Sequence, residues 1–383
     1  MNTTHFVIGM NKCLYLMFLL ALISCGGSNN DPETPLIPEP EVPTNPEPDE
    51  PSVPETLEQP DGTRQGVLSQ PRMHLEGDKL FVCTSQGLYA KDLTREGSAY
   101  QLVGFKGIPL QDYVRRGNDI LALRYNRGKE FLLLSHDDGQ TYEDITPDIF
   151  CKEDQEVLPS LVQHPTDYNT LLVSSLYYGV FRSKDFGKTW EQLTDYLWGN
   201  ANTSQIGFHP TQPNIIYNSG ESMIMSGNIN ISYDDGKTWN NHGESLGFPG
   251  DNCVHRPAFH PTNPNHWVIG GEGCVFTTDD NGETWSVQNF WDDDSKVAYW
   301  YFAEFDNKNP DIVYLVGPLD NSVIECKIKI MCSTDGGQSW NEPLRLPMMK
   351  EHDWVNDLLQ YKDRLFIYAE TGIYEVAKSD IIK

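Results

Sequence analysis

The stretch from Ser183 to Trp190, SKDFGKTW, decides the fold, because close copies of it recur along the chain. Copies begin at residues 135, 183, 232, 278 and 333, and each fits S/T-x-D-x-G-x-T/S-W/Y. In such an octapeptide the carboxylate binds nearby backbone N–H groups, the glycine adopts a conformation that a Cβ disfavours, and the hydroxyl caps the turn. The final aromatic residue is expected to enter the core between sheets.

The spacing of the octapeptides predicts a β-propeller. Successive copies start 48, 49, 46 and 55 residues apart, which is close to the length of one four-stranded blade. A second phrase, His-Pro-Thr, precedes three of the copies at His164, His209 and His260, and a β-rich run follows each. We interpret these histidines as parts of a repeated turn rather than as metal ligands.

Two degenerate repeats extend the series at both ends. The sequences Gly87-Leu88-Tyr89 and Gly372-Ile373-Tyr374 match Gly179-Val180-Phe181, which leads into the second octapeptide. With the five octapeptides they predict an all-β, single seven-bladed propeller, with six blades as the alternative. Closing the ring is expected to pair the last blade with sequence near Leu68.

The octapeptides resemble the Asp-box, or BNR repeat. This resemblance implies that the motif aspartates are structural and lie between the third and fourth strands, away from the ligand-binding face. These residues are Asp137, Asp185, Asp234, Asp280 and Asp335. The repeats are more similar to those of xyloglucanases and of a photosystem assembly factor than to sialidases. The sialidase motif is matched only by Phe105 to Pro109, with Lys for Arg and an extra Gly, so no sialidase residue is assigned.

The N-terminal sequence is typical of an exported lipoprotein. An apolar run from Leu14 to Ile23 follows Lys12, and Leu22 to Cys25 resembles the lipobox of bacterial lipoproteins. Together with the repeats, it makes the chain similar to propeller lipoproteins of the Bacteroidetes type. We therefore expect a signal peptide at 1–24, a lipidated Cys25 with a disordered Pro/Glu-rich stalk at 25–60, and the propeller at 61–383. An ordinary secretory signal is the alternative. The expected location is the outer membrane, at the cell surface or in the periplasm.

Composition restricts the partners. The formal net charge of −27 disfavours nucleic acid and anionic membrane surfaces, and leaves a lipid anchor as the membrane contact. Polyanions would need a local basic pocket. No Cys/His pattern indicates a metal, and no motif indicates a cofactor. Cys253 with Cys274 and Cys326 with Cys332 are possible bridges, with free buried thiols as the alternative.

Candidate functional residues follow from the expected topology, in which ligands bind at the channel mouth formed by inter-blade loops. His255, Arg256, Glu272 and Asp293 are the candidates for acid or base chemistry. Flat aromatic residues can stack on sugar rings, and those expected near the mouth are Tyr178, Trp198, Trp291 and Trp354.

These residues leave three functions open. The first is a lipoprotein that binds a glycan for a polysaccharide-utilisation system. The second is a glycoside hydrolase or polysaccharide lyase with its site in one propeller, which requires two titratable groups with displaced pKa values. The third is a scaffold that binds a protein partner on a broad apolar surface. The xyloglucanase resemblance implies a cleft between two propellers, which one propeller cannot form.

Overall fold

A computed structural model describes residues 71–124, 131–150, 160–175, 179–195, 205–221, 227–242, 254–290, 300–318, 328–341, 343–346, 355–369 and 372–382. All of them lie in the second of two compact units, residues 51–383. The predicted signal peptide and stalk, with Cys25, lie outside the described residues and stay a prediction. Among the described residues, no helix is long and apolar enough to span a bilayer.

The first four sheets are four-stranded and antiparallel throughout. The first contains β1 (Met73–Glu76), β2 (Lys79–Thr84), β3 (Gly87–Asp92) and β4 (Gln101–Gly104). The second contains β5 (Leu110–Arg116), β6 (Asp119–Arg124), β7 (Leu132–Ser135) and β8 (Glu143–Asp144), followed by a 3-10 turn at Asp148–Phe150. The third contains β9 (Ser160–Gln163), β10 (Leu171–Ser175), β11 (Gly179–Ser183) and β12 (Glu191–Thr194). The fourth contains β13 (Gln205–Phe208), β14 (Ile216–Glu221), β15 (Gly227–Ser232) and β16 (Asn240–Asn241).

Three further sheets complete the described architecture. The fifth contains β17 (Ala258–Phe259), β18 (Trp267–Gly270), β19 (Cys274–Thr278) and β20 (Ser286–Asn289). The sixth contains β21 (Phe302–Phe305), β22 (Val313–Pro318), β23 (Ile328–Ser333) and β24 (Leu344–Leu346). The seventh has three described strands, β25 (Val355–Tyr361), β26 (Arg364–Ala369) and β27 (Gly372–Ala377), and the short helix α1 (Lys378–Ile381) follows.

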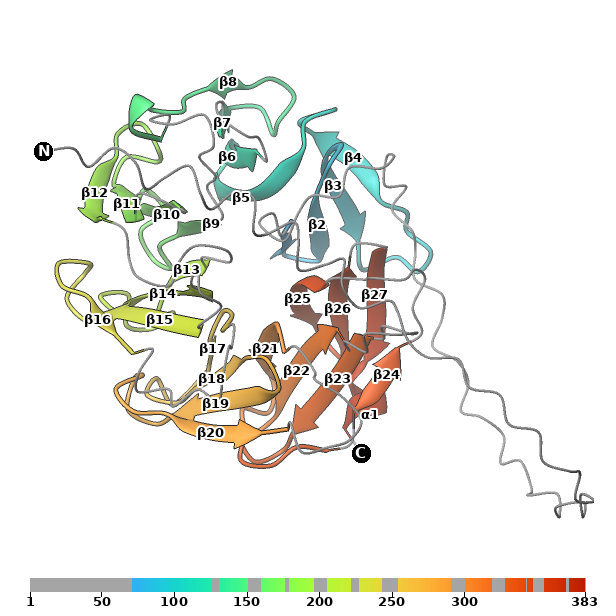
Figure 1. The fold of residues 1–383 in the computed structure, drawn as a ribbon. Coiled ribbons are helices and arrows are strands. Elements are labelled where there is room, and N and C mark those ends of the chain that lie inside the picture. Colours follow the sequence, from blue (N-terminus) through green and yellow to red (C-terminus); the bar gives the residue numbers. More distant parts are fainter. Residues whose placement is uncertain are drawn as a thin grey trace, which may run out of the picture. The chain divides into compact units, whose positions relative to one another are not determined.

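The seven sheets are the blades of a propeller, as Figure 1 shows, with the first strand of each blade nearest the centre. One hydrophobic cluster fills each interface between neighbouring blades. The cluster that joins the last blade to the first includes Met73 and Val82 with Phe366 and Tyr368, and so closes the ring. The prediction of seven blades is therefore confirmed, and six is excluded. Leu68 lies outside the described residues.

The middle strands are buried on both faces because each sheet is covered by a neighbour on either side. Every residue of β10 and β11 is buried, although the sequences LLVSS and GVFRS alternate poorly. Continuous burial of this kind explains why period-two alternation is weak in the sequence.

The octapeptides connect the third strand to the fourth in the second to sixth blades, as the resemblance implied. In the copy at 278–285, Asp280 Oδ1 accepts the Thr284 N–H at 2.8 Å, and Asp280 Oδ2 accepts the Thr284 hydroxyl at 2.6 Å. The Thr278 hydroxyl accepts the Gly282 N–H at 3.0 Å. The corresponding bonds recur in the other four copies, so each motif carboxylate organises its turn.

Two details of the octapeptides differ from the prediction. Tyr142, the aromatic residue of the first copy, is 43 % exposed and stacks on Phe105 at the surface, whereas the four Trp residues pack against interface clusters. In addition, the residue before the conserved glycine also has positive φ, as in Phe186 and Asp235. Two consecutive left-handed residues thus form the turn.

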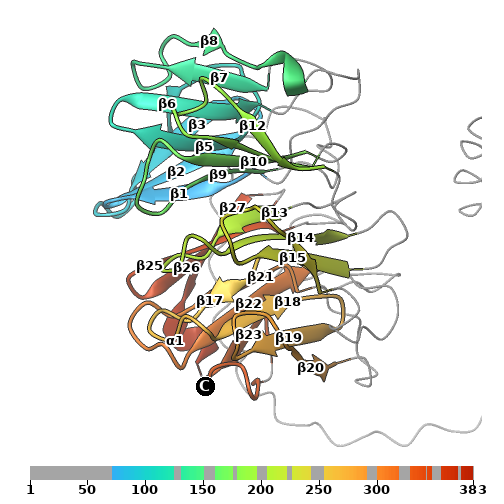
Figure 2. The ribbon, with the colours of Figure 1, turned by 90° about the vertical axis from the view of Figure 1, so that its left-hand side faces the viewer.

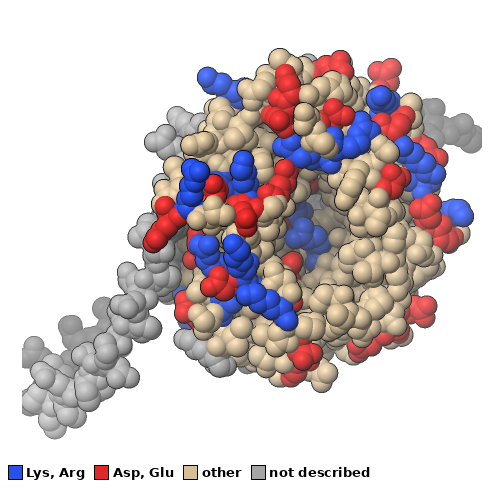
Figure 3. Space-filling model, turned by 180° about the vertical axis from the view of Figure 1, so that it is seen from behind, with Lys and Arg blue, Asp and Glu red and all other residues tan. Residues whose placement is uncertain are grey.

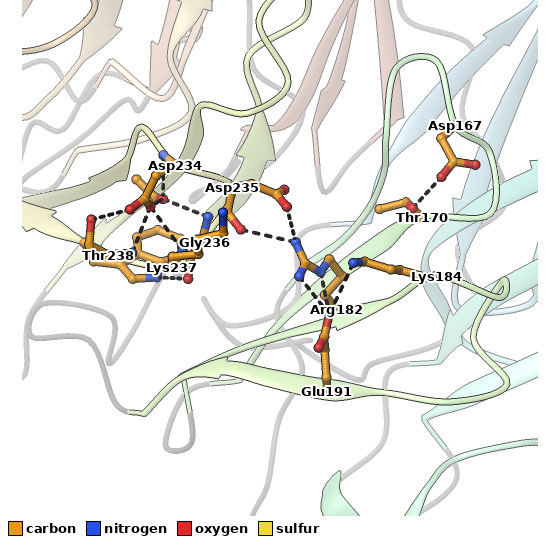
Figure 4. A network of polar contacts seen from close by, with 12 residues as sticks. Asp167, Thr170, Arg182, Lys184, Glu191, Asp234, Asp235, Gly236, Lys237 and Thr238 are labelled. Carbon is orange, nitrogen blue, oxygen red and sulfur yellow. Dashed lines mark hydrogen bonds and ion pairs between the residues drawn. The ribbon is translucent and has the colours of Figure 1, made fainter.

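Arg182 links the third blade to the octapeptide of the fourth. Its guanidinium donates from Nη1 to the Asp235 carboxylate at 2.8 Å and to the Asp235 carbonyl at 3.2 Å, and from Nε to Glu191 at 2.8 Å (Figure 4). Because Arg182 is 8 % exposed, it fixes the position of a neighbouring turn with a largely desolvated charge.

The His-Pro-Thr turns have the structural role that was predicted. His164 Nδ1 accepts the backbone N–H groups of Thr166 and Asp167 at 3.2 and 2.9 Å, and His209 and His260 do the same in the next two blades. In the sixth blade Asp306 replaces the histidine and accepts the N–H groups of Lys308 and Asn309.

Asp306 also holds α1. Lys378 Nζ donates to Asp306 Oδ2 at 2.6 Å and to Gln360 Oε1 at 2.8 Å. Lys378 and Asp306 are 6 % and 4 % exposed, so the pair is buried. The helix itself contacts β23 and β27, and Figure 2 labels it near the C-terminal end of the chain.

Candidate functional site: a charged cluster in the central channel

The propeller is hollowed at its centre, and Lys or Arg side chains are visible inside the hollow (Figure 3). Four charged residues at or near the start of first strands contact one another or lie close together. We call them the central cluster: Arg72, Asp112, Arg256 and Asp357. They lie at the channel end where inter-blade connections enter the blades, which is the end predicted to bind ligand.

Two β-bulges orient the aspartates of the central cluster. The register of β5 against β6 shifts between Leu110 and Asp112, and that of β25 against β26 shifts between Val355 and Asp357. Each aspartate then accepts the N–H of the next residue, at 2.7 Å in Asp112 and 3.0 Å in Asp357. Bulges commonly redirect side chains beside functional sites, and here they do so at equivalent positions of two blades.

Asp357 is shared by two guanidinium groups. Arg72 Nη1 lies 3.5 Å and Arg256 Nη2 lies 3.3 Å from Asp357 Oδ1, while Asp357 Oδ2 accepts the Met73 N–H at 2.9 Å. Both guanidiniums also lie over the ring of Phe302, at 5.6 and 5.7 Å from its centroid. Asp357 therefore joins the first, fifth and last blades.

The two arginines differ in exposure. The Arg72 side chain is 9 % exposed, whereas the Arg256 side chain is 33 % exposed. Burial lowers the pKa of Arg72, and Asp357 offsets this effect only in part. For Arg256 burial also lowers the pKa, but Asp357, Tyr217 and Glu304 together raise it above its ordinary value. Both groups are cations at any physiological pH.

Asp112 is paired with His74, whose Nε2 lies 2.6 Å from Asp112 Oδ1. Burial lowers the pKa of His74, but the charge and hydrogen bond of Asp112 outweigh it, so that the pKa is raised. A raised folded-state pKa stabilises the fold fully below the unfolded value of about 6.5, and this contribution is lost as pH rises through the folded pKa.

We therefore expect wild-type protein to lose more stability than His74→Gln between pH 6 and pH 8.5. Burial lowers the pKa values of His209 and His260, so these two residues make the folded protein more stable, not less, as pH rises through this range. The comparison between variant and wild type isolates His74, because the other histidines are unchanged. Unfolding free energies from urea titration at both pH values provide the test, and equal slopes for the two proteins would contradict it.

His255 lies beside the cluster as a buried, neutral imidazole. It is 3 % exposed, and neither ring nitrogen has a hydrogen-bond partner among the described residues. Burial and the charge of Arg72 lower its pKa to about 3, and its ring lies 4.4 Å from that of Tyr301. The structure thus brings His255 and Arg256 to the predicted channel end. A catalytic role for either stays a prediction.

The other predicted site residues are not brought together by the described structure. Glu272 follows β18 at intermediate exposure, and its charge contributes, after burial, to raising the pKa of the buried Cys274 thiol to about 12. Asp293, Tyr178, Trp198, Trp291 and Trp354 lie outside the described residues. Cys83, Cys274 and Cys332 are buried free thiols, while Cys253 and Cys326 also lie outside.

The prediction missed Arg72, Asp112 and Asp357, which complete the cluster around Arg256. A signal was present, since the pairs Gln111-Asp112 and Asn356-Asp357 place an amide and an acid at the same point of two repeats. Both repeats lack the His-Pro-Thr phrase that would have aligned them. Within the described residues, no group of three His, Cys, Asp or Glu side chains is arranged to hold a metal ion.

The fold and the site define a seven-bladed β-propeller with charged residues in its channel, and comparison with known proteins agrees with this class. A family model described as sortilin, neurotensin receptor 3, matches residues 227–373. A probable oligoxyloglucan-reducing end-specific xyloglucanase of Neosartorya fischeri is 25 % identical over 218 residues, 53 % of this chain and 25 % of that protein. Photosystem II assembly protein Ycf48 of Thermosynechococcus vestitus is 24 % identical over 200 residues, 51 % of this chain and 49 % of that protein.

Solved structures show the same fold. A GH74 xyloglucanase from Xanthomonas campestris has a TM-score of 0.56 at 16 % identity, over 78 % of this chain and 50 % of that chain. Ycf48 bound to D1 peptide has a TM-score of 0.54 at 15 % identity, over 86 % of this chain and 99 % of that chain. The chain spans half or less of the two curated relatives.

Proposed function

We propose that this chain is an envelope-anchored lipoprotein whose single propeller recognises a glycan at the central cluster, in the service of polysaccharide utilisation. The observation that supports recognition rather than cleavage is the state of the cluster's carboxylates. Asp112 pairs with His74, and Asp357 pairs with two arginines. Glycoside hydrolysis normally requires one carboxylate as acid and a second as base or nucleophile, and neither aspartate is free for such a role.

Glu304 is the one described carboxylate near the cluster with acid character. Burial raises its pKa, although Arg256 and a hydrogen bond from Gln360 at 3.0 Å oppose this shift. The carboxylate that acts on it, Asp357, is held by Arg72 and Arg256. Glu304 therefore has no free carboxylate partner in the described chain, which supports binding better than hydrolysis.

Similarity to the xyloglucanases supports a glycan as the ligand, and the part of those proteins that is covered bears on the mechanism. This chain matches 50 % of the Xanthomonas enzyme. Half of that enzyme is thus not matched, and its activity as a whole is not transferred to this chain.

A peptide or protein ligand is the second candidate. The observation in its favour is that this chain matches nearly the whole length of two Ycf48 structures. It covers 99 % of the Ycf48 chain that is bound to a D1 peptide and 97 % of the Ycf48 chain from Cyanidioschyzon merolae. A protein of that single-propeller size binds a peptide. We propose the same binding place, the channel end of the propeller, for either ligand, a glycan or a peptide.

The test is a binding and product analysis of the full-length protein, purified in detergent, against neutral and acidic polysaccharides and their oligosaccharides. We expect saturable binding with no released product. Released sugars would instead establish the hydrolase or lyase alternative, and Glu304→Gln would show whether the described acid takes part. If no saccharide binds but a peptide does, the second candidate, a peptide or protein ligand, is favoured.

A further inference from the structure

The arginines of the central cluster have more hydrogen-bond donors than the described chain has acceptors for them. A guanidinium carries five N–H donors. The hydrogen bond of Arg256 within the described residues runs from Nη2 to Asp357, and those of Arg72 both start at Nη1. Because the Asp357 side chain is 3 % exposed and the Arg256 side chain is 33 % exposed, the acceptor is enclosed while the Arg256 side chain stays partly accessible.

The charges of the cluster also leave a cation without a full partner. Asp357 is the carboxylate that contacts both Arg72 and Arg256. The second aspartate, Asp112, is held by His74 at 2.6 Å rather than by an arginine. In direct contact, two guanidinium groups therefore share one carboxylate, although Asp112 and Glu304 lie close enough to raise the pKa of Arg256. In a chain whose net charge is −27, this pair of arginines is where an acidic group of a ligand can bind.

The geometry favours a carboxylate among anions. A guanidinium is planar and matches the two oxygens of a carboxylate with parallel hydrogen bonds. Phe302 packs beneath Arg256 with its centroid 5.7 Å from the guanidinium carbon, and this contact restrains the guanidinium. The strong negative charge of the whole chain would repel an extended polyanion, so one acidic group at the end of a ligand fits better than a polyanionic chain.

From these observations we infer that Arg256 binds the carboxylate of a terminal uronic acid, so that the glycan bound by this propeller ends in an acidic sugar. The inference rests on the proposed glycan-binding function and specifies its ligand class. Arg256 is the contact residue, while the buried Asp357 and Phe302 hold its guanidinium in place.

The test uses isothermal titration calorimetry on full-length protein in detergent, with neutral oligosaccharides that end in one galacturonic acid or in one glucuronic acid as probes. Each probe is compared with its methyl ester, which keeps the sugars and removes the single charge. Loss of a charged hydrogen-bonded pair weakens binding by about 10- to 100-fold, and we expect this loss both on esterification and in Arg256→Ala. Arg256→Lys keeps the charge but loses the planar guanidinium, so its affinity for the acidic probe should lie between those of wild type and Arg256→Ala. Arg345→Ala is the matched control, because Arg345 is exposed on the outer strand β24.

The possible outcomes distinguish failure of the acidic-sugar inference from failure of the proposed glycan-binding function. Equal affinity for acid and ester overturns the inference even if Arg256→Ala proves unstable, because that comparison needs no variant. If neutral oligosaccharides bind, and bind equally well to Arg256→Ala, the proposed glycan-binding function stands but the inference of an acidic sugar is overturned. If no oligosaccharide binds, both the proposed function and the inference are overturned. Binding of a free-acid peptide but not its C-terminal amide, dependent on Arg256, would assign the carboxylate to a peptide and overturn the glycan source.

Discussion

Asp357→Ala should lower the free energy of unfolding by about 3–5 kcal/mol, the range measured when one member of a buried ion pair is removed. The variant leaves Arg72, 9 % exposed, without its carboxylate partner. It also removes the acceptor of the Met73 N–H and so weakens the contact between the last and first blades. Urea denaturation monitored by tryptophan fluorescence measures the loss.

Asp363→Ala is the matched control for this prediction. Asp363 lies in the same blade, in the exposed turn between β25 and β26, and its replacement should change the unfolding free energy by less than about 0.5 kcal/mol. If Asp357→Ala were as mild as the control, the central cluster would have no part in closing the ring.

Gly179→Ala should be at least as damaging, with an expected loss of about 4 kcal/mol or more. Gly179 begins β11 with φ of +89°, and an added Cβ would lie 2.2 Å from the Thr194 carbonyl oxygen and 2.3 Å from that of Asp195. Both obstacles are backbone atoms of the fourth strand and the residue after it, so no side-chain rotation can relieve the clash. The change would therefore separate β12 from β11 or prevent the third blade from folding.

Gly117→Ala separates the steric clash from backbone strain. Gly117 also has positive φ, +63°, but nothing lies within 4 Å of the position that its Cβ would take. It should lose only the cost of a left-handed alanine, about 1–2 kcal/mol. Thermal melts of the two variants in parallel test the difference, and equal losses would show that the close approach at Gly179 has been overestimated.

The repeated parts of the fold could be predicted from the sequence because they reuse one local solution. The octapeptide depends on bonds within eight residues, as at Asp280 and Thr284, so its letters alone identify it. The requirement for glycine before Val180 also arises within one blade. At its counterpart Gly87, as at Gly179, an added Cβ would clash with carbonyl oxygens at the end of the fourth strand. Tyr142 was mispredicted because exposure depends on which neighbouring blade covers the turn, and that is not encoded in the motif.

The central cluster was harder to predict because its contacts join positions far apart in the chain. Arg72 and Asp357 are separated by 285 residues, and only ring closure brings them together. The prediction selected Arg256 because it broke the pattern of its repeat. It missed Asp357, because the shared amide-acid pair at 111–112 and 356–357 gains meaning only once the two repeats are aligned, and the bulges there have no turn signal of their own.

The replacement of a turn histidine by Asp306 has a consequence for synthesis. The carboxylate needs a cation, and that cation, Lys378, belongs to the last described element of the chain. In a nascent chain without α1, the Asp306 carboxylate keeps its hydrogen bonds within the sixth blade but has no cation. Burying such a charge without its partner is unfavourable, so the last blade can cover Asp306 favourably only once α1 has been made. Packing of the sixth blade against the last is in this way coupled to synthesis of α1.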